Sequence, residues 1–269
     1  MRFSLTKFGL ILLLGLLLGC KEQDDGKTTL KVGTISGPET RLMQVAKHVA
    51  KEKFGLNIAV IEFNDYLMPN TALADNSINA NMFQHEPYLK AASAAKGYDF
   101  AIVGKTFVYP MGLYSSKHQH LEDLPSNAKI AIPNDPSNEA RALLLLEKAG
   151  LIKLNSAAKT NVTTQDIEQN PKKLIIQELD AAQLPRTLSD VDLAAINTNY
   201  AMVAGFIPSR DALFIEDKHS PYANIVVVRN KDKNDARFKQ LVEALHSQDV
   251  IATADQLFHG EAIPAWETN

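Results

Sequence analysis

The sequence predicts an α/β protein of two lobes with a ligand cleft between them. Strand-like and helix-like patterns alternate along the chain, the alternation begins again near residue 129, and a helical tail follows the last strand. Such alternation is typical of sheets covered by helices. The tail has no strand pattern of its own, so we expect it to pack on the first half. The first lobe then comprises residues 30–112 and 225–269, and the second comprises residues 113–224.

Residues 1–19 have the features of a secretory signal peptide. Arg2 and Lys7 come before an apolar run over residues 8–18, and Gly19 follows it. A positively charged start, an apolar segment and a small residue before the cleavage site define such a signal. The run is shorter than the roughly twenty apolar residues that a membrane-spanning helix needs.

Cys20 ends the segment Leu17-Leu18-Gly19-Cys20, which resembles the bacterial lipobox. Cleavage at a lipobox leaves a cysteine that carries lipid, so we predict that Cys20 is lipidated; the alternative is a free cysteine left in a cleaved signal. Cys20 is the only cysteine, which excludes a disulfide within the chain and a cysteine-based zinc site. The polar residues 20–29 are expected to form a flexible tether between the lipid and the folded part.

Charge and motifs argue against several kinds of protein. The chain of 269 residues has 31 acidic and 28 basic residues, a net charge of -3 and no arginine-rich stripe, so nucleic acid is not expected as a partner. The Gly-x-Ser-x-Gly elbow, the P-loop and the His-Glu-x-x-His motif are all missing. Only His118 and His120 have a ligand-like spacing, with no second motif near them. We expect no metal, no cofactor and no enzymatic activity.

The first half begins with a strand, a helix and a second strand. Residues 30–35 alternate apolar and polar side chains, and residues 57–63 form the next strand. Between them, Pro38 suits the first position of a helix that runs from about Glu39 to Phe54, and the Glu39 carboxylate favours the positive end of that helix. This βαβ unit should place its ligand side at the carboxyl ends of the strands.

The remaining elements follow from similar patterns. In the first half we expect a short helix at 71–76, a strand at 78–83, a helix from 86 or 87 to 96, a strand at 100–108 and extended chain at 113–115. In the second half we expect strands at 129–132, 174–179 and 191–196, and helices at 139–149 and 199–204. A strand at 222–228 and one or two helices over 235–258 complete the chain.

The stretch from Phe63 to Tyr88 is expected to form loops that line a cavity. It places the rings of Tyr66 and Phe83 and the imidazole of His85 among several amides. Aromatic walls with a few polar groups suit one small amphipathic ligand. The alternative is a run of ordinary connecting loops. His85 follows a strand, where it could hydrogen-bond a ligand or be an exposed turn histidine.

Arg141 is a candidate for binding a carboxylate. Ser137 or Asn138 is expected to cap the helix, which places Arg141 in the first turn, where a cation is disfavoured unless an anion accompanies it. A guanidinium binds a carboxylate through two parallel hydrogen bonds. The alternatives are pairing with Glu147 and a solvated side chain.

Three asparagines complete the candidate site. Asn197 and Asn199 lie in a strand-to-helix turn, and their amides supply the donors and acceptors that a zwitterion requires. Capping of the following helix is the alternative role for this pair. Asn224 lies in a strand that crosses between the lobes, where its amide could face the cleft; asparagine is depleted in strands.

Together these segments resemble the methionine-binding lipoproteins that serve bacterial ABC importers (the MetQ/NlpA family). The resemblance covers nearly all of the mature chain and rests on Lys31-Val32-Gly33 with Gly37-Pro38-Glu39, Asn64-Asp65-Tyr66 with Pro69-Asn70, Ala80-Asn81-Met82-Phe83-Gln84-His85 with Pro87-Tyr88, Asn134-Asp135-Pro136-Ser137-Asn138 with Arg141, and Ile196-Asn197-x-Asn199-Tyr200-Ala201. Asn76-Ser77-Ile78-Asn79 departs from the family pattern, which commonly has a glycine and an aspartate there.

The resemblance implies a type II periplasmic-binding-protein fold and roles for six residues. These roles are a carboxylate clamp by Arg141, contacts to the carboxylate and ammonium by Asn199 and Asn224, and enclosure of the ligand side chain by Tyr66, Phe83 and His85.

The implied function is capture of methionine, in the L or D form, and its delivery to an ABC permease with its ATPase. Lipidated Cys20 would anchor the protein to a membrane of the bacterial cell envelope. Two alternatives belong to other classes. One is a secreted small-molecule hydrolase or transferase with His85 as its base, and the other is a surface lipoprotein, an adhesin or scaffold, that does not transport.

Overall fold

The structure, a computed structural model, describes residues 29–155, 162–217 and 220–266. The predicted signal peptide, Cys20 and the tether up to residue 28 lie outside these residues. Thr29 was assigned to the tether, but it is the first residue of strand β1 (Thr29–Ile35), because it pairs with Asn57 of the neighbouring strand. Within the described part of the chain, no helix combines the length and the apolar character needed to cross a bilayer.

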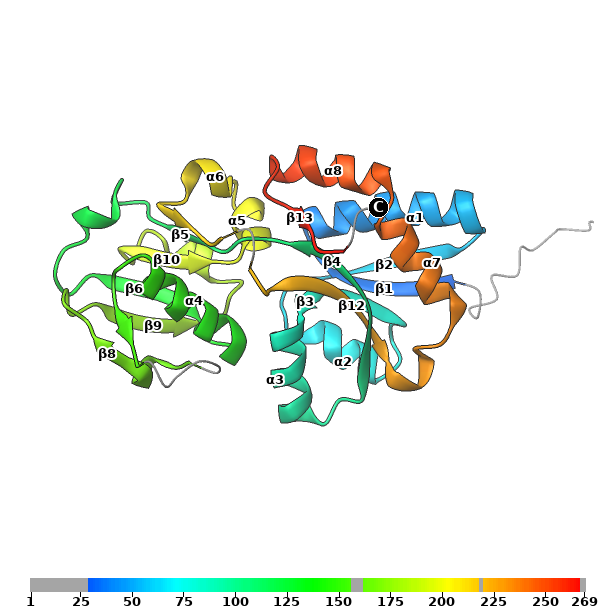
Figure 1. Ribbon diagram of the computed structural model, residues 1–269, viewed down its shortest axis with the longest axis horizontal. Coiled ribbons are helices and arrows are strands. Elements are labelled where there is room, and N and C mark those ends of the chain that lie inside the picture. Colours follow the sequence, from blue (N-terminus) through cyan, green and yellow to red (C-terminus); the bar gives the residue numbers. More distant parts are fainter. Residues whose placement is uncertain (1–28, 156–161, 218–219, 267–269) are drawn as a thin grey trace, which may run out of the picture.

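Two mixed sheets form two lobes that lie side by side along the long axis of the molecule (Figure 1). The first sheet has the strand order β13-β4-β12-β3-β1-β2, and the second has the order β11-β5-β10-β6-β9. Besides β1, the first sheet contains β2 (Asn57–Phe63), β3 (Ala80–His85), β4 (Phe100–Val108), β12 (Ala223–Arg229) and β13 (Ile263–Pro264). The second contains β5 (Gly112–Tyr114), β6 (Lys129–Pro133), β9 (Ile175–Leu179), β10 (Leu193–Ile196) and β11 (Phe214–Ile215). A separate hairpin joins β7 (Lys153–Leu154) and β8 (Ile167–Gln169).

The predicted βαβ unit is confirmed. Strands β1 and β2 are parallel, and helix α1 (Pro38–Phe54) connects them. Pro38 is the first helical residue, where its missing N–H costs nothing, and Gly55 ends the helix with φ 67°, which glycine adopts without a Cβ clash. The carboxyl ends of β1 and β3 therefore meet at one edge of the sheet, which is the edge nearest the second lobe (Figure 1).

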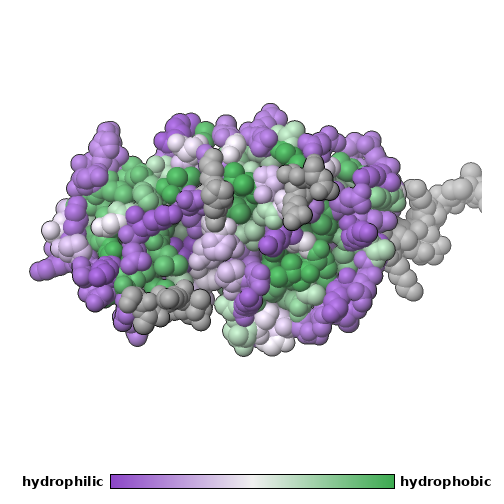
Figure 2. Space-filling model, in the orientation of Figure 1, coloured by the Kyte–Doolittle hydropathy of each residue, from purple (hydrophilic) through white to green (hydrophobic). Residues whose placement is uncertain are grey.

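Helices cover both faces of the first sheet. Helix α1 packs on one face together with α7 (Ala236–Leu245) and α8 (Gln248–Phe258), which form the helical tail. Helices α2 (Met68–Ala74) and α3 (Glu86–Lys96) pack on the other face. On the side of the molecule seen in Figure 2, hydrophilic residues predominate along the outline of both lobes.

The second sheet has α4 (Pro136–Lys148) on one face, where Leu143 and Leu146 pack against Ile130 and Ile132. The other face carries α5 (Thr198–Val203) and a 3-10 turn at Leu184–Thr187, and α6 (Pro208–Asp211) follows α5 along the chain. The apolar cluster on this face also includes residues of the first lobe, among them Ile35, Phe83 and Tyr88. The two lobes thus share buried side chains where the sheets approach each other.

Two connections cross between the lobes, from β4 to β5 and from β11 to β12. They lie side by side, because the backbone of Glu216 donates to the carbonyl of Met111 at 2.8 Å. The sequence-based boundaries need a small correction. Gly112 belongs to the second sheet, where it pairs with β10, and Asn224 belongs to the first, where it pairs with β3.

Candidate functional site

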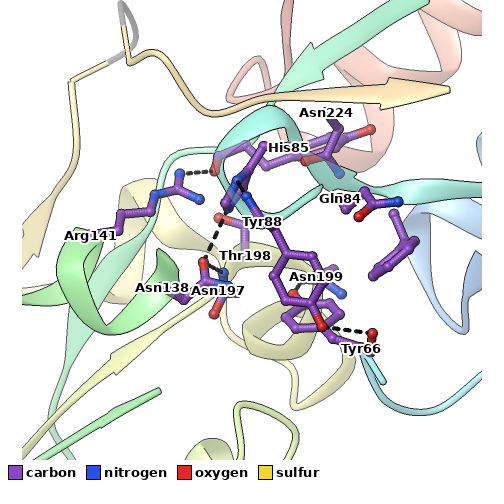
Figure 3. Close-up of a pocket in the computed structure, with 12 residues that line it drawn as sticks. Tyr66, Gln84, His85, Tyr88, Asn138, Arg141, Asn197, Thr198, Asn199 and Asn224 are labelled. Atoms are coloured by element: carbon purple, nitrogen blue, oxygen red, sulfur yellow. Dashed lines mark hydrogen bonds between the residues drawn. The ribbon is translucent and has the colours of Figure 1, made fainter. Parts of the chain in front are cut away.

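A small cavity lies between the two lobes, close to the crossing connections (Figure 3). The first lobe and its crossing segment contribute Tyr66, Phe83, Gln84, His85, Tyr88, Tyr109 and Asn224. The second lobe contributes Asn138, Arg141, Asn197, Thr198 and Asn199. All six side chains to which the family resemblance gave a ligand-binding role line this cavity, and so does Asn197. This lining of aromatic rings and a few polar groups suits a small organic ligand.

Helix α4 positions Arg141 differently from the sequence-based expectation. The N-cap is Asp135, whose carboxylate accepts from the backbone N–H of Asn138 at 3.0 Å, so the prediction of Ser137 or Asn138 as the cap was wrong. Pro136 takes the first helical position because its fixed φ suits it. Arg141 is therefore the sixth helical residue and lies in the second turn, beyond the strongest part of the unfavourable helix-end field.

The Arg141 side chain is 4 % exposed and is fixed on several sides. Its Nε donates to the two carboxylate oxygens of Glu216 at 3.0 and 3.1 Å, and its Nη2 also contacts that carboxylate. Nη2 donates as well to the backbone carbonyl of Tyr109 at 3.0 Å, and the guanidinium carbon lies 4.4 Å from the centre of the Tyr222 ring. Pairing with Glu147 was wrong, because that carboxylate accepts from the backbone of Leu154 instead.

His85 ends β3 and caps helix α3. Its Nδ1 accepts from the backbone N–H of Tyr88 at 3.2 Å, which leaves the ring proton on Nε2, 3.4 Å from Oδ1 of Asn138 in the other lobe. The side chain is buried, so the alternative of an exposed turn histidine was wrong. Burial and the nearby charge of Arg141 lower the pKa of His85 to about 3, and the imidazole is neutral near pH 7.

An aromatic cluster forms one wall of the cavity. The ring centres of Tyr66, Phe83 and Tyr88 lie 5.7 to 6.0 Å apart, and Tyr200 of the second lobe lies 4.9 Å from Tyr66.

The stretch from Phe63 to Tyr88 was expected to be loops, but much of it is α2 and β3. Phe83 and His85 occupy alternate positions of β3 and so share one side of the strand.

Two asparagines after β10 present unpaired polar atoms. The Oδ1 atom of Asn199 accepts from the Tyr66 hydroxyl at 2.8 Å, and Nδ2 of Asn197 donates to Asn138 at 2.9 Å. The opposite ends of the two amides, Nδ2 of Asn199 and Oδ1 of Asn197, are buried with no hydrogen-bond partner in the described part of the chain. Asn197 is the N-cap residue of α5, but its side chain makes no capping hydrogen bond, so side-chain capping as the alternative role was wrong. A buried unpaired donor and acceptor are costly unless a ligand satisfies them.

Asn224 lies on β12, directly opposite His85 of β3. Its Nδ2 donates to the carboxyl oxygen Oε1 of Glu39 at 2.6 Å. Sheet register therefore brings an amide and an imidazole from distant parts of the sequence to the same edge of the cavity.

In the described ranges no group of three metal-ligating side chains occurs, and His118 contacts Asp192 at 3.4 Å.

Comparison with known proteins relates the whole folded part of the chain to one family. The family model described as NlpA lipoprotein matches residues 30–266. The chain belongs to the NlpA lipoprotein family. A D-methionine-binding lipoprotein MetQ of Salmonella typhi is 46% identical over 252 residues, which cover 93% of each chain.

Solved structures agree with this membership. An ABC transporter periplasmic substrate-binding protein from Coxiella burnetii is 62% identical with a TM-score of 0.85, and the match covers 88% of this chain and 100% of the other. A nutrient binding protein from Burkholderia cenocepacia, bound to methionine, is 52% identical with a TM-score of 0.86 and the same coverage. The family resemblance and the two-lobed α/β fold predicted from the sequence are both confirmed.

Sequence reasoning missed several residues around the cavity of this NlpA-family chain. Gln84, Tyr88 and Asn138 lie inside the segments that carried the family resemblance, so their place in those segments was an available signal. Glu39 appeared as a favourable helix-end charge and in a family segment, without a binding role, and Glu216 had no local signal at all. Its role depends on a contact across 75 residues of sequence.

Proposed function

We propose that this NlpA-family chain captures methionine in the cleft between its lobes and delivers it to an ABC permease with its ATPase. A MetQ relative is described as a D-methionine-binding lipoprotein, and a neighbour of known structure is bound to methionine. The proposal includes a signal peptide at residues 1–19 and a lipid anchor on Cys20. The lipobox-like sequence and membership of a lipoprotein family support that anchor.

One observation carries the proposal: a guanidinium, unpaired amide atoms and an aromatic cluster face a single small cavity. In the proposed complex Arg141 binds the α-carboxylate, and Asn199 and Asn224 contact the carboxylate and the ammonium. Tyr66 and Phe83, with His85, enclose the side chain. A thioether beside aromatic rings gains about 0.3–1.5 kcal/mol from each contact, which suits methionine.

Contacts to both lobes explain how a ligand would favour a closed arrangement. Tyr66 of the first lobe donates to Asn199 of the second, and His85 faces Asn138 across the same gap. A ligand that touches both sides binds the closed state more tightly than any state in which the lobes are apart, so it shifts the population toward closure. The two side-by-side connections at Met111 and Glu216 are the proposed hinge.

Binding without turnover fits the chemistry of His85. A general base near neutral pH needs a pKa close to the working pH and a free lone pair. The pKa of His85 is lowered to about 3, chiefly by burial, and Nδ1 already accepts from the backbone of Tyr88. We therefore propose that the chain is a binding protein and not a hydrolase or transferase.

The proposal is tested by identifying the ligand. Purified protein is denatured, the released small molecules are identified by mass spectrometry, and L- and D-methionine are titrated into ligand-stripped protein by calorimetry. We expect saturable binding of unchanged methionine. Conversion of the bound molecule would favour an enzyme, and the lack of any thermal shift with any amino acid would favour a surface lipoprotein that does not transport.

A further inference from the structure

Glu39 is a buried carboxyl group at the edge of the site. It is the second residue of α1, it is 1 % exposed, and its Oε1 accepts from Nδ2 of Asn224 at 2.6 Å. Its position near the helix N-terminus favours a negative charge. Glu39 does not itself line the cavity, but its partner Asn224 does.

The contact with Glu39 fixes which end of the Asn224 amide is available to a ligand. In the structure Oε1 of Glu39 faces the NH₂ end of the amide, and this is the arrangement that the ionised carboxylate requires, because a carboxylate only accepts hydrogen bonds. A turned amide would place two oxygen atoms against each other. Oδ1 of Asn224 is then the end that remains for the cavity, and an amide oxygen accepts from an ammonium group.

The surroundings of Glu39 provide little to balance a negative charge. Its hydrogen-bond partner is a neutral amide, and the titratable groups that interact with it are Tyr66, Tyr109 and Tyr200 from three other segments. Burial raises the pKa of Glu39 to about 8, and it raises the pKa values of these tyrosines as well. A buried carboxylate is costly without a cation, so a cationic group bound nearby would stabilise its ionised form.

We propose that Glu39 is a positioning residue that selects ligands with an α-ammonium group. It turns Oδ1 of Asn224 toward the cavity and, when an ammonium group is bound, places a negative charge behind it. The inference rests on the proposed function, because it assigns one end of the amino-acid ligand to this pair. It adds a buried carboxyl group that recognises the ammonium through another side chain.

The test compares two ligands that differ only in the ammonium. Methionine and 4-(methylthio)butanoate, which lacks the amino group, are titrated by calorimetry into the wild-type protein and into Glu39→Gln. The glutamine keeps the side-chain volume and an acceptor atom but removes the charge of the carboxylate. It also allows the side-chain amides at positions 39 and 224 to turn together. We expect methionine to bind at least tenfold more weakly to Glu39→Gln, and the affinity for 4-(methylthio)butanoate to change less than threefold.

Glu139→Gln is the matched control, since Glu139 is also a buried glutamate in the first turn of a helix and its carboxylate accepts from the backbone of Thr164 instead. We expect that variant to bind both ligands as the wild type does. An equal loss for both ligands in Glu39→Gln would indicate a merely structural role and overturn the inference. Equal affinities of the wild type for the two ligands would overturn it without any variant. Failure of the wild type to bind methionine at all would instead defeat the proposed function and this inference with it.

Discussion

The guanidinium of Arg141 and the carboxylate of Glu216 form a two-point ion pair at the place where the chain crosses between the lobes. The Glu216 carboxylate also accepts from the backbone N–H of Met111 on the other crossing connection at 3.2 Å. Helix α4 of the second lobe is thereby tied to both connections. Arg141 lines the cavity between the lobes and Glu216 does not, so the glutamate holds the guanidinium from outside this cavity.

Replacing Arg141 with alanine should strongly weaken the binding of amino acids. The variant loses the group proposed to bind the α-carboxylate, and truncation of one partner of a buried charge pair costs about 2–5 kcal/mol, which is roughly a thirtyfold to several-thousandfold loss of affinity. Calorimetry with methionine measures the effect, and Arg186→Ala, which changes an exposed arginine of the second lobe, is the control. A loss of affinity of less than about tenfold in Arg141→Ala would remove Arg141 from the site.

Replacing Glu216 with glutamine should lower stability and increase the stabilisation that methionine provides. Breaking a buried ion pair costs about 3–5 kcal/mol because the remaining charge has no partner. The carboxylate of a bound ligand can then supply part of the missing charge to Arg141. Thermal unfolding should show a lower midpoint without ligand and a larger rise with saturating methionine than in the wild type. An unchanged midpoint, or a smaller ligand-induced rise, would contradict the role given to Glu216.

Removing the hydroxyl of Tyr66 should speed release of the ligand. Tyr66→Phe keeps the aromatic ring but removes the hydrogen bond to Asn199 that connects the two lobes. A hydrogen bond of this kind is worth about 1 kcal/mol, so the dissociation rate should rise roughly fivefold. Stopped-flow fluorescence provides the rate. Tyr98→Phe is the control, because its hydroxyl lies outside the cavity between the lobes, and it should leave the dissociation rate near the wild-type value. Equal effects in both variants would argue against the Tyr66 contact.

The free energy of unfolding should fall in acid because burial disfavours the protonated form of His85 in the folded protein. Its pKa is about 3 in the folded protein against 6.5 ordinarily, and burial is the main cause. The unfolded chain therefore binds more protons than the folded chain between these values. The contribution is fully present above pH 6.5 and is lost as the pH falls toward 3, by on the order of 5 kcal/mol.

Denaturant unfolding at several pH values tests this prediction for His85. In His85→Gln the decline between pH 6.5 and 3 should be shallower than in the wild type. His48→Gln alters an exposed histidine that pairs with Glu52, and it should leave the wild-type pH dependence in place. Identical pH profiles for the wild type and His85→Gln would show that His85 contributes nothing to acid unfolding.

Replacing Cys20 with alanine should release the protein from the membrane. The proposed acyl chains are attached to that sulfur, and no other cysteine exists to replace it. Membrane fractionation and intact-mass measurement compare the variant with the wild type. The variant should be found in the soluble fraction without an acyl mass increment. An unmodified wild-type chain that still sediments with membranes would show that another feature binds it there.

The amino-acid sequence alone determined the fold class and most of the elements. Pro38, Gly55 and Gly97 act through their own backbone preferences, and apolar periodicity depends on near neighbours, so helices such as α1 and α3 were predicted closely. The family segments also contained five of the six residues given a ligand-binding role, all but Asn224, and the structure brings all six to one cavity. Local signals sufficed because each of these features is encoded within a few residues.

Only the tertiary structure decided which groups pair inside the site. Glu216 meets Arg141, Asn224 meets Glu39, and Tyr66 meets Asn199, across 75, 185 and 133 residues of sequence respectively. These pairs depend on the register of β12 against β3 and on the approach of the two lobes, which no short segment specifies. The sequence therefore supplied the chemical groups. Long-range packing fixed their burial, their orientation and their charge state, because desolvation and hydrogen bonding depend on the groups that surround them after folding.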